Sequence, residues 1–291
     1  SVSCSFTVTV EDNEDPEIVC PTNVTVEIDG TVTGGPATLV ASGPCGVTLT
    51  YTAPVGTDNC PGAQTFLTGG LGAGPSYYEY GGTYTESYQV IDAAGNTATC
   101  SFTITVEDAV PPMITCPVDM TVNNDPGTCG AVVNYSLPIA TDNCPGYTIT
   151  LVQGLPSGSI FPLGTTTVED QIVDDMGNST SCMFDVTVVD NEAPSFACPA
   201  DQDVTANANC EGTVPDLTAG LVATDNCPGA VVITQSPVAG SDFGGANGDE
   251  LIVTLTATDL AGNSYSCEVT LTLVDEEDPM ITCPTVAASY N

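Results

Sequence analysis

The stretch TDNCPG occurs three times in this chain, at residues 57–62, 141–146 and 224–229. Successive copies start 84 and then 83 residues apart, which is the spacing of a small domain. Self-similarity at a fixed period indicates a repeat architecture. Three other landmarks recur with it: a Cys-Pro pair, a cysteine ahead of TDNC, and a Gly-Asn turn followed by a last cysteine.

These landmarks divide the chain into three complete repeats, at residues 13–108, 109–190 and 191–275. The run SVSCSFTVTVED at 1–12 matches TATCSFTITVED at 97–108, so we expect it to end a preceding repeat. Residues 276–291 contain MITCP, which also opens the second repeat, so we expect them to start a following one. The sequence therefore predicts a segment of a longer array.

Each repeat is made of short runs such as FTITV, VTVEI and LIVTLTA, separated by turns rich in Gly, Pro and Asn. Period-two alternation of β-branched residues predicts antiparallel strands. About seven such runs per repeat fit an immunoglobulin-like sandwich. We predict an all-β chain of tandem immunoglobulin-like β-sandwiches that forms an extended rod.

The charge of the chain argues against several classes of function. The 291 residues include 37 acids and no Lys, Arg or His, which gives a net charge of −37. Nucleic acid and anionic membranes are repelled by such a chain, and no apolar run is long enough to span a bilayer. The chain lacks the common nucleophile-activating bases and cationic clamps. A paired-carboxylate hydrolase is disfavoured because the acids recur with the repeat, so we predict no enzyme.

The 14 cysteines predict disulfides and therefore an oxidising, extracellular compartment. A zinc site is a poor alternative, since the chain has no His and no C-x-x-C pair.

The second repeat carries in order ITCPVDMTV, GTCGAVVNY, ATDNCPG, GLPSGSIFPLGTTTV and DDMGNSTSCMFDVTVVD, and it strongly resembles a hyalin repeat, or HYR domain. The resemblance covers essentially the whole chain. The first and third repeats depart from it after TDNCPG, where GGLGAGPSYYEYGG and FGGANGDE stand. It implies an immunoglobulin-like fold, placement at the cell surface, and a role in adhesion or surface structure without enzyme activity.

An immunoglobulin-like strand order brings the Cys-Pro cysteine of each repeat close to the cysteine after the Gly-Asn turn. The predicted long-range pairs are Cys20–Cys100, Cys116–Cys182 and Cys198–Cys267. The remaining pairs would be Cys45–Cys60, Cys129–Cys144 and Cys210–Cys227. These short pairs require the intervening strand to turn back, so that the Cα atoms come within about 7 Å. Cys4 and Cys283 are left over.

A rival pairing would link neighbouring repeats through cysteines 16 residues apart, such as Cys4 and Cys20. An extended segment of that length spans roughly 50 Å, which argues against the rival.

Acidic residues gather at the repeat junctions, where the linker, the TDN loop and the D-x-x-G-N loop are expected at one end of a sandwich. Ca²⁺ takes 6–8 oxygen ligands, and no basic side chain is present to neutralise these acids. We predict structural Ca²⁺, whereas the alternative is that these residues only form turns. The predicted ligand sets are Asp12, Asp58, Asn59, Asp92 and Asn96 at the first junction, Asp108, Asp142, Asn143, Asp174 and Asn178 at the second, and Asp190, Asp225, Asn226, Asp259 and Asn263 at the third. The second linker has the fewest acids, which predicts the weakest site there.

The sequence thus predicts an extracellular spacer or filament segment whose partners are neighbouring repeats and other copies in a fibre. The alternative is a binding module, in which Tyr77, Tyr78 and Tyr80 of the loop at 69–82 recognise a glycan or protein. Sequons at Asn23, Asn134 and Asn178 are N-glycosylation acceptors in a secretory host, but they arise easily by chance in a Thr-rich chain.

Overall fold

The computed structural model describes residues 2–278, and the second MITCP motif with Cys283 lies outside the described residues. Within 2–278 the chain forms strands and turns and no helix. Its internal contacts divide it into two compact units. Unit 1 holds the residues up to Val118, Ser136–Gly154 and Thr167–Phe184, and unit 2 holds Asp119–Tyr135, Leu155–Thr166 and the residues from Asp185 onward. The loops that join the first repeat to the second all lie in unit 1, and those that join the second to the third lie in unit 2.

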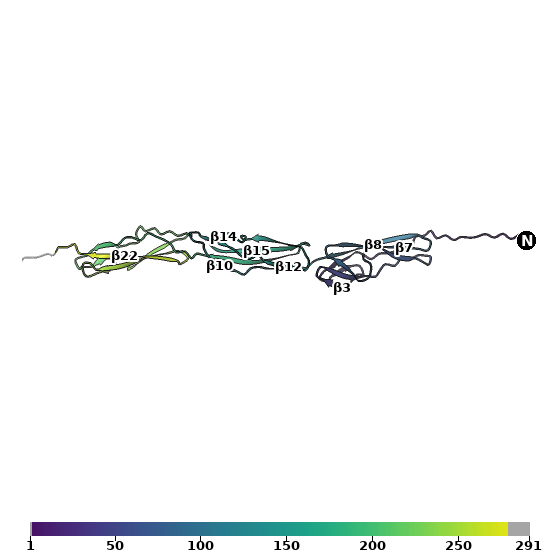
Figure 1. Cartoon of the computed structure of the whole chain (residues 1–291), viewed down its shortest axis with the longest axis horizontal. Coiled ribbons are helices and arrows are strands. Elements are labelled where there is room, and N and C mark those ends of the chain that lie inside the picture. The colour runs from purple at the N-terminus through teal and green to yellow at the C-terminus, as the bar shows by residue number, and fades with distance from the viewer. Residues whose placement is uncertain (1, 279–291) are drawn as a thin grey trace, which may run out of the picture. The chain divides into compact units, whose positions relative to one another are not determined.

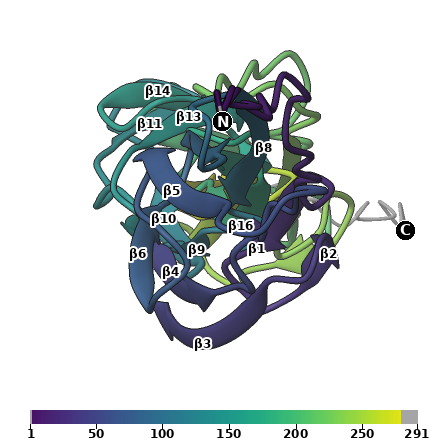
Figure 2. The same ribbon diagram turned by 90° about the vertical axis from the view of Figure 1, so that its right-hand side faces the viewer.

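The first repeat is a two-layer β-sandwich. One sheet has the strand order β2-β1-β8-β7-β5 and the other β3-β4-β6, whose three strands lie side by side in Figure 2. Strand β1 runs parallel to β8, and β7 and β8 form a long antiparallel hairpin (Figure 1). The bounds are β1 Val24–Glu27, β2 Val32–Gly34, β3 Thr38–Gly43, β4 Gly46–Thr50, β5 Gln64–Gly69, β6 Ser76–Glu79, β7 Thr83–Ile91 and β8 Thr97–Glu107.

Alternation in the sequence produces the core of this sandwich. In β8 every second side chain from Phe102 to Val106 is buried, and Val24 and Val26 of β1 are buried beside them. Val47 and Leu49 of β4 come from the opposite sheet and join the same core cluster. Burial of each such side chain stabilises the fold by about 1.5–3 kcal/mol before conformational entropy is subtracted.

The second and third repeats keep the parallel pairing of an early strand with the last one. The sheets are β10-β16-β15-β13 and β17-β22-β21-β19, accompanied by the small pairs β11-β14, β12-β9 and β18-β20. The second repeat has β9 Met113–Thr115, β10 Met120–Asn123, β11 Gly130–Val133, β12 Ile139–Thr141, β13 Tyr147–Gln153, β14 Ser159–Pro162, β15 Gly164–Asp174 and β16 Ser179–Val189. The third has β17 Gln202–Thr205, β18 Gly212–Thr213, β19 Val232–Ser236, β20 Asp242–Phe243, β21 Glu250–Thr258 and β22 Ser264–Val274.

Tandem β-sandwiches are therefore what the strand pattern predicted. Residues 2–12, which match a closing strand in sequence, form no strand here, because a strand needs neighbours such as β1 and β7 beside β8. Their assignment to a preceding repeat, and the other repeat boundaries, remain predictions.

A buried carboxylate organises the first repeat. Glu86 of β7 is fully buried and accepts hydrogen bonds from the hydroxyls of Tyr51 (2.7 Å) and Tyr78 (3.1 Å). The backbone N–H groups of Leu71 and Gly72 donate to it as well, each at 2.9 Å. Four neutral donors thus take the place of the basic partner that this chain does not have.

The loop that reaches Glu86 depends on Gly70, whose φ is +96° and where a Cβ atom would collide with the carboxylate. Burial, followed by the contacts with Glu86 and neighbouring tyrosines, raises the pKa values of Tyr51 and Tyr78. Both hydroxyls therefore stay protonated and able to donate.

We expect Glu86→Gln to lower the free energy of unfolding of the first repeat by about 2–4 kcal/mol, because one oxygen becomes an NH₂ group that faces buried donors. Glu79→Gln, at an exposed position, is the control. The measurement is denaturant unfolding followed by tyrosine fluorescence, since the chain has no Trp and six of its ten tyrosines lie in the first repeat. Equal midpoints for the two variants would contradict the role of Glu86.

Candidate metal centres and disulfides at the repeat junctions

The D-x-x-G-N loop of each repeat is built around its aspartate. In the first repeat Asp92 Oδ1 accepts the backbone N–H groups of Ala94, Gly95 and Asn96 at 2.6–2.9 Å. Burial opposes ionisation of Asp92, but the hydrogen bonds from Asn96, Gly95 and Ala94 outweigh it and lower its pKa. Similar contacts recur in the later repeats. These hydrogen bonds fix the shape of the loop around its aspartate.

The asparagine of this loop fastens the linker. The side-chain NH₂ of Asn178 donates to Asp174 Oδ2 (2.8 Å) and to the backbone carbonyl of Asp108 (2.7 Å). Asn96 and Asn263 make the same two kinds of contact. These contacts use the amide nitrogens, and the role of the amide oxygens as ligands stays a prediction. The sequon nitrogen of Asn178 is thereby engaged within the junction.

Three carboxylates converge at the second junction. Oxygens of Asp108, Asp142 and Asp174 lie within 4.8 Å of one another, and Asp108 and Asp174 are buried. Asn143 Nδ2 donates to Asp108 Oδ2 at 3.0 Å. However, Asp142 Oδ1 and Asn143 Oδ1 are buried without a hydrogen-bond partner among the described residues. Burial raises the pKa of Asp142, as expected for a carboxylate that is short of donors.

The third junction also contains buried oxygens that lack a hydrogen-bond donor. Asp190, Asp225 and Asp259 line a cavity of about 150 Å³. Within the described chain, Asp225 Oδ2 and Asn226 Oδ1 are buried and have no partner. Asp190 and Asp225 also approach the sulfur of Cys227, but that sulfur is in a disulfide and offers no thiolate. The two carboxylates and the amide oxygen are therefore the candidate ligands.

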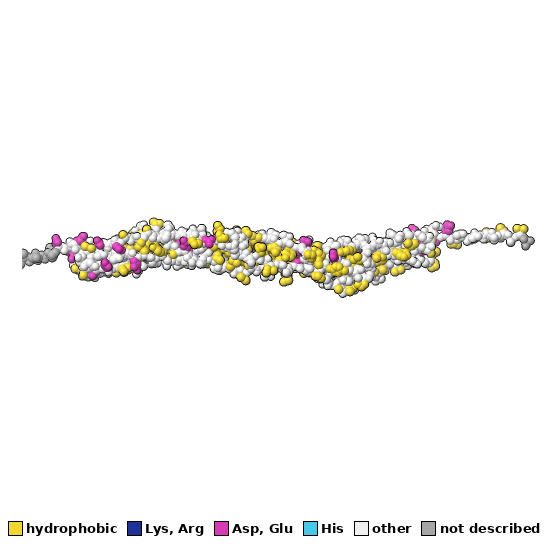
Figure 3. Space-filling view, viewed as in Figure 1, with side chains coloured by type: hydrophobic (Ala, Val, Ile, Leu, Met, Phe, Trp, Pro, Cys, Tyr) yellow, Lys and Arg dark blue, Asp and Glu magenta, His cyan; other side chains and the backbone are white. Residues whose placement is uncertain are grey.

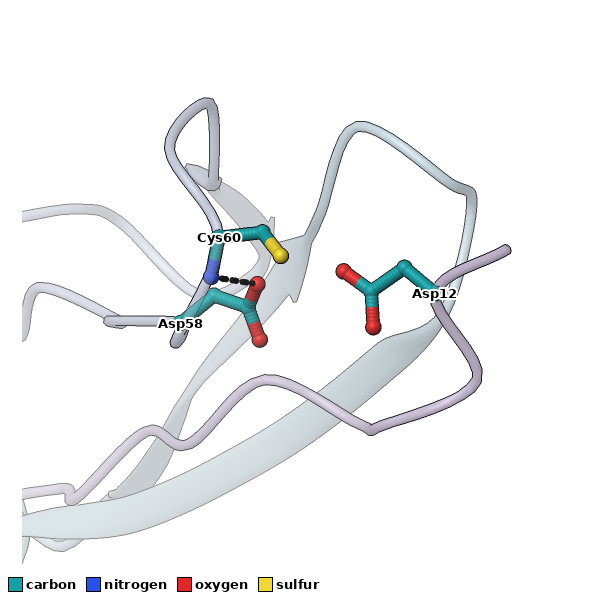
Figure 4. Close-up of side chains that lie close together, drawn as sticks. All are labelled: Asp12, Asp58 and Cys60. Carbon is teal, nitrogen blue, oxygen red and sulfur yellow. Dashed lines mark hydrogen bonds between the residues drawn. The ribbon is translucent and has the colours of Figure 1, made fainter. Parts of the chain in front are cut away.

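The candidate ligands at the first junction are more exposed to solvent than those at the other two. Asp12, Asp58 and Cys60 place ligand atoms within 4.8 Å of one another, and the Asp12 carboxylate lies opposite that of Asp58 in Figure 4. Asp58 Oδ2 accepts the backbone N–H of Cys60 at 2.9 Å. A hydrogen bond to Asp12 raises the pKa of the Cys60 thiol. Asn59, a further predicted ligand, donates through Nδ2 to Glu14 at 2.7 Å.

The three long-range disulfides predicted from the strand order are present: Cys20–Cys100, Cys116–Cys182 and Cys198–Cys267. Each joins the segment ahead of an early strand to the last strand of the same repeat.

The three short pairs, Cys45–Cys60, Cys129–Cys144 and Cys210–Cys227, are wrong. The structure instead joins Cys45 to Cys144 and Cys129 to Cys227, with Cα–Cα distances of 4.9 and 4.7 Å. After the first cysteine the chain runs along β4 away from that end, at about 3.3 Å per residue, and does not turn back before TDNC. The two cysteines of the second repeat, Cys129 and Cys144, therefore lie at opposite ends, and each meets a cysteine of a neighbouring repeat.

The tyrosines of the loop at 69–82 do not form a stacking surface. Tyr78 is fully buried, while Tyr77 is about half exposed and donates its hydroxyl to the Cys45 carbonyl at 3.1 Å. The Tyr80 hydroxyl donates to the carbonyl of Pro145, in the TDNCPG motif of the second repeat, at 2.8 Å. The loop is thus part of the core and of the junction, and the binding-module alternative loses its main observation.

The chain is similar to known proteins along most of its length. Residues 107–188 match the HYR domain model. The hyalin of Strongylocentrotus purpuratus is 32% identical over 96% of this chain, and that of Lytechinus variegatus is 31% identical over 97%. The chain spans only 23% and 52% of the lengths of these two relatives.

Among solved structures, the chain is similar to extracellular cadherin domains 3–6 of protocadherin gamma B2, with 15% identity and a TM-score of 0.36 over 94% of this chain and 76% of that one. For domains EC22–24 of mouse cadherin-23 the identity is 13% and the TM-score 0.35, over 90% of this chain and 100% of that one. These scores are too low to inform function.

No helix among residues 2–278 is long and apolar enough to cross a membrane. The HYR match, the similarity to hyalin along most of the chain and the five disulfides lead to one assignment. The chain belongs to the HYR family, together with the hyalins, and is extracellular.

Proposed function

We propose that this segment is a structural spacer whose junctions are fastened by a disulfide between adjacent repeats and stiffened by Ca²⁺. The observation that carries the proposal is the coincidence of the two features. At both junctions that join complete repeats, a disulfide crosses from one repeat to the next and buried oxygens lack donors beside it.

The disulfide supports the mechanical part of the proposal. Cys144 belongs to the core cluster of the first repeat although it lies in the second, so the bond holds the TDNC loop against its neighbour. At the next junction Asn226 Nδ2 donates to the Thr128 carbonyl at 3.0 Å, next to the Cys129–Cys227 bond. A short covalent link combined with hydrogen bonds restricts bending more than a linker does alone.

The oxygens support the metal part. A buried acceptor without a donor costs about 1–3 kcal/mol, and no Lys, Arg or His can approach it. Figure 3 shows acidic side chains among neutral ones on the surface and no basic ones. Ca²⁺ accepts carboxylate, amide and backbone oxygens in irregular numbers, which fits Asp108, Asp142, Asn143 and Asp174. One Ca²⁺ bound there would offset two of the three negative charges and hold the linker to the TDN loop.

We propose a different order of calcium affinity among the junctions from the one that the linker sequences predict. The number of acids in each linker predicts the weakest calcium site at the second junction. However, the ligand groups come mainly from the loops, and within residues 2–278 only the second junction brings three carboxylate oxygens within 4.8 Å. We therefore propose the second junction as the tightest site.

We expect Ca²⁺ to raise the melting temperature of the chain at constant ionic strength, because it binds only the folded junction. At a concentration of 100 times Kd it would add about 2.7 kcal/mol of stability. Asp142→Asn should remove one bound ion in calorimetric titration. In chelator it should be at least as stable as the parent, since the amide keeps an acceptor for Cys144 and removes one repelling charge.

The control is Asp203→Asn, which removes one exposed charge on β17 and should bind as many ions as the parent. A melting temperature that does not respond to Ca²⁺ or chelator would refute the metal part. An Asp142→Asn chain that binds Ca²⁺ like the parent would refute the assignment of the site.

The disulfide is tested with the double variant Cys45→Ser/Cys144→Ser, which removes the bond without leaving a free thiol. We expect the first and second repeats to unfold in separate calorimetric transitions and the distribution of maximum dimensions in small-angle scattering to broaden. Cys4→Ser, at an exposed free cysteine, is the control. If the double variant matches the control, the bond does not restrict the junction.

A further inference from the structure

The five disulfides of the described chain close loops that overlap along the sequence. They join residue 20 to 100, 45 to 144, 116 to 182, 129 to 227 and 198 to 267. Each loop begins before the preceding one ends, so together they span every peptide bond between the first and the last of these cysteines. Of the five, Cys45–Cys144 alone spans the second linker, residues 101–115, and Cys129–Cys227 alone spans the third, residues 183–197.

These two linkers are open to proteases. Residues 108–112 and 190–194 form no strand, and Ala109 and Asn191 are exposed. Exposed segments outside regular structure are the preferred sites of proteolytic cleavage. In a chain whose disulfides closed only within repeats, one cut in a linker would separate two repeats. The linkers are therefore the places where a disulfide between repeats has the largest effect.

The chain on each side of the second linker is held by its own contacts. Ahead of the linker, Asp108 accepts a hydrogen bond from Asn178 at its backbone carbonyl (2.7 Å) and one from Asn143 at its carboxylate (3.0 Å). Behind it, β9 (Met113–Thr115) pairs with β12 of the same repeat. A cut after Ala109 therefore leaves both new ends close to an anchored residue.

The disulfide that spans this linker is anchored in both repeats. Cys45 and Cys144 pack in the core cluster of the first repeat, where Cys144 is 3% exposed. Cys144 also belongs to the TDNC loop of the second repeat, and its backbone N–H donates to Asp142 at 3.4 Å. Beside it the Tyr80 hydroxyl donates to the Pro145 carbonyl at 2.8 Å. The bond thus connects two folded repeats and not two loose segments.

We propose that the overlapping disulfides protect this chain against severing, because a single protease cut anywhere between Cys20 and Cys267 leaves the repeats joined and folded. The protease hydrolyses one peptide bond, which consumes one water and leaves a carboxylate and an amine. Without a disulfide across the cut, the contact between repeats becomes bimolecular and is lost on dilution. With the disulfide it stays intramolecular, at an effective concentration on the order of mM. The inference rests on the proposed spacer and its junction disulfides, but not on Ca²⁺.

The chain itself offers a sharp test. It has no Lys or Arg, so one introduced lysine creates one trypsin site. Ala109→Lys places that site in the second linker, and chelator is present throughout so that Ca²⁺ does not contribute. We expect trypsin to cut every chain, and the product to run as one band on a non-reducing denaturing gel and to melt at the temperature of the uncut chain. With dithiothreitol it should give two fragments.

The matched controls differ in which junction disulfide is removed. In the chain with the lysine in the second linker, Cys45→Ser/Cys144→Ser should release both fragments without reductant. Cys129→Ser/Cys227→Ser should not, since that bond does not span the second linker. With Asn191→Lys, which places the trypsin site in the third linker, the two double variants should exchange these results.

Two results would overturn the inference. One is a native chain that trypsin does not cut at the new lysine, since the linker would then need no protection. The other is a cut chain that retains Cys45–Cys144 but melts at a lower temperature or expands in small-angle scattering. Mass spectrometry of a non-reduced digest with a glutamate-specific protease reports the disulfides. If it finds no Cys45–Cys144, the proposed junction fails and the inference fails with it.

Discussion

Every buried acid of this chain must be satisfied without a basic side chain, and this constraint shapes the structure. Glu86 recruits two tyrosine hydroxyls and two backbone N–H groups, and Asp92 recruits its own loop. Asp142 and Asp225 each keep one buried oxygen without a donor. Some acids of this chain therefore have enough hydrogen-bond donors, whereas others do not. The acids that keep an oxygen without a donor stand at the junctions between complete repeats, where the proposed Ca²⁺ would supply the missing partner.

The disulfides between repeats couple the stability of one repeat to that of its neighbour. A bond within a repeat restrains the unfolded state of that repeat alone. Cys45–Cys144 closes a loop of 99 residues that covers parts of two repeats, and a loop of that size restricts the unfolded chain by about 4.7 kcal/mol in the entropy model. Because the bond also packs Cys144 into the core of the first repeat, the two repeats share part of that stabilisation. Neighbouring sandwiches are thereby coupled through one covalent contact and its surroundings.

Alternation and period made the strands and the repeats predictable, and the strand order made Cys20–Cys100 and its two equivalents predictable. The error with Cys45 has a physical origin, since the period shows which residues are equivalent but not at which end of a repeat each one lies. Reading β4 as a single extended pass would have placed Cys45 and Cys60 at opposite ends. The Glu86 cluster had no sequence signal, because its donors come from separate segments of the first repeat.

The junction aspartates and asparagines divide into two roles that residue type alone does not distinguish. Both oxygens of Asp174 accept hydrogen bonds from Asn178, and the Asn178 side-chain NH₂ also donates to the Asp108 carbonyl, so the two residues fix where the linker lies. Asp142 and Asn143 keep acceptors unused. An oxygen that already accepts one N–H keeps a second lone pair, so Asp174 can still contribute to the proposed site, but the oxygens without any donor come from the TDN motif. The D-x-x-G-N motif also holds the linker beside the TDN loop, which gives both motifs a reason to recur with each repeat.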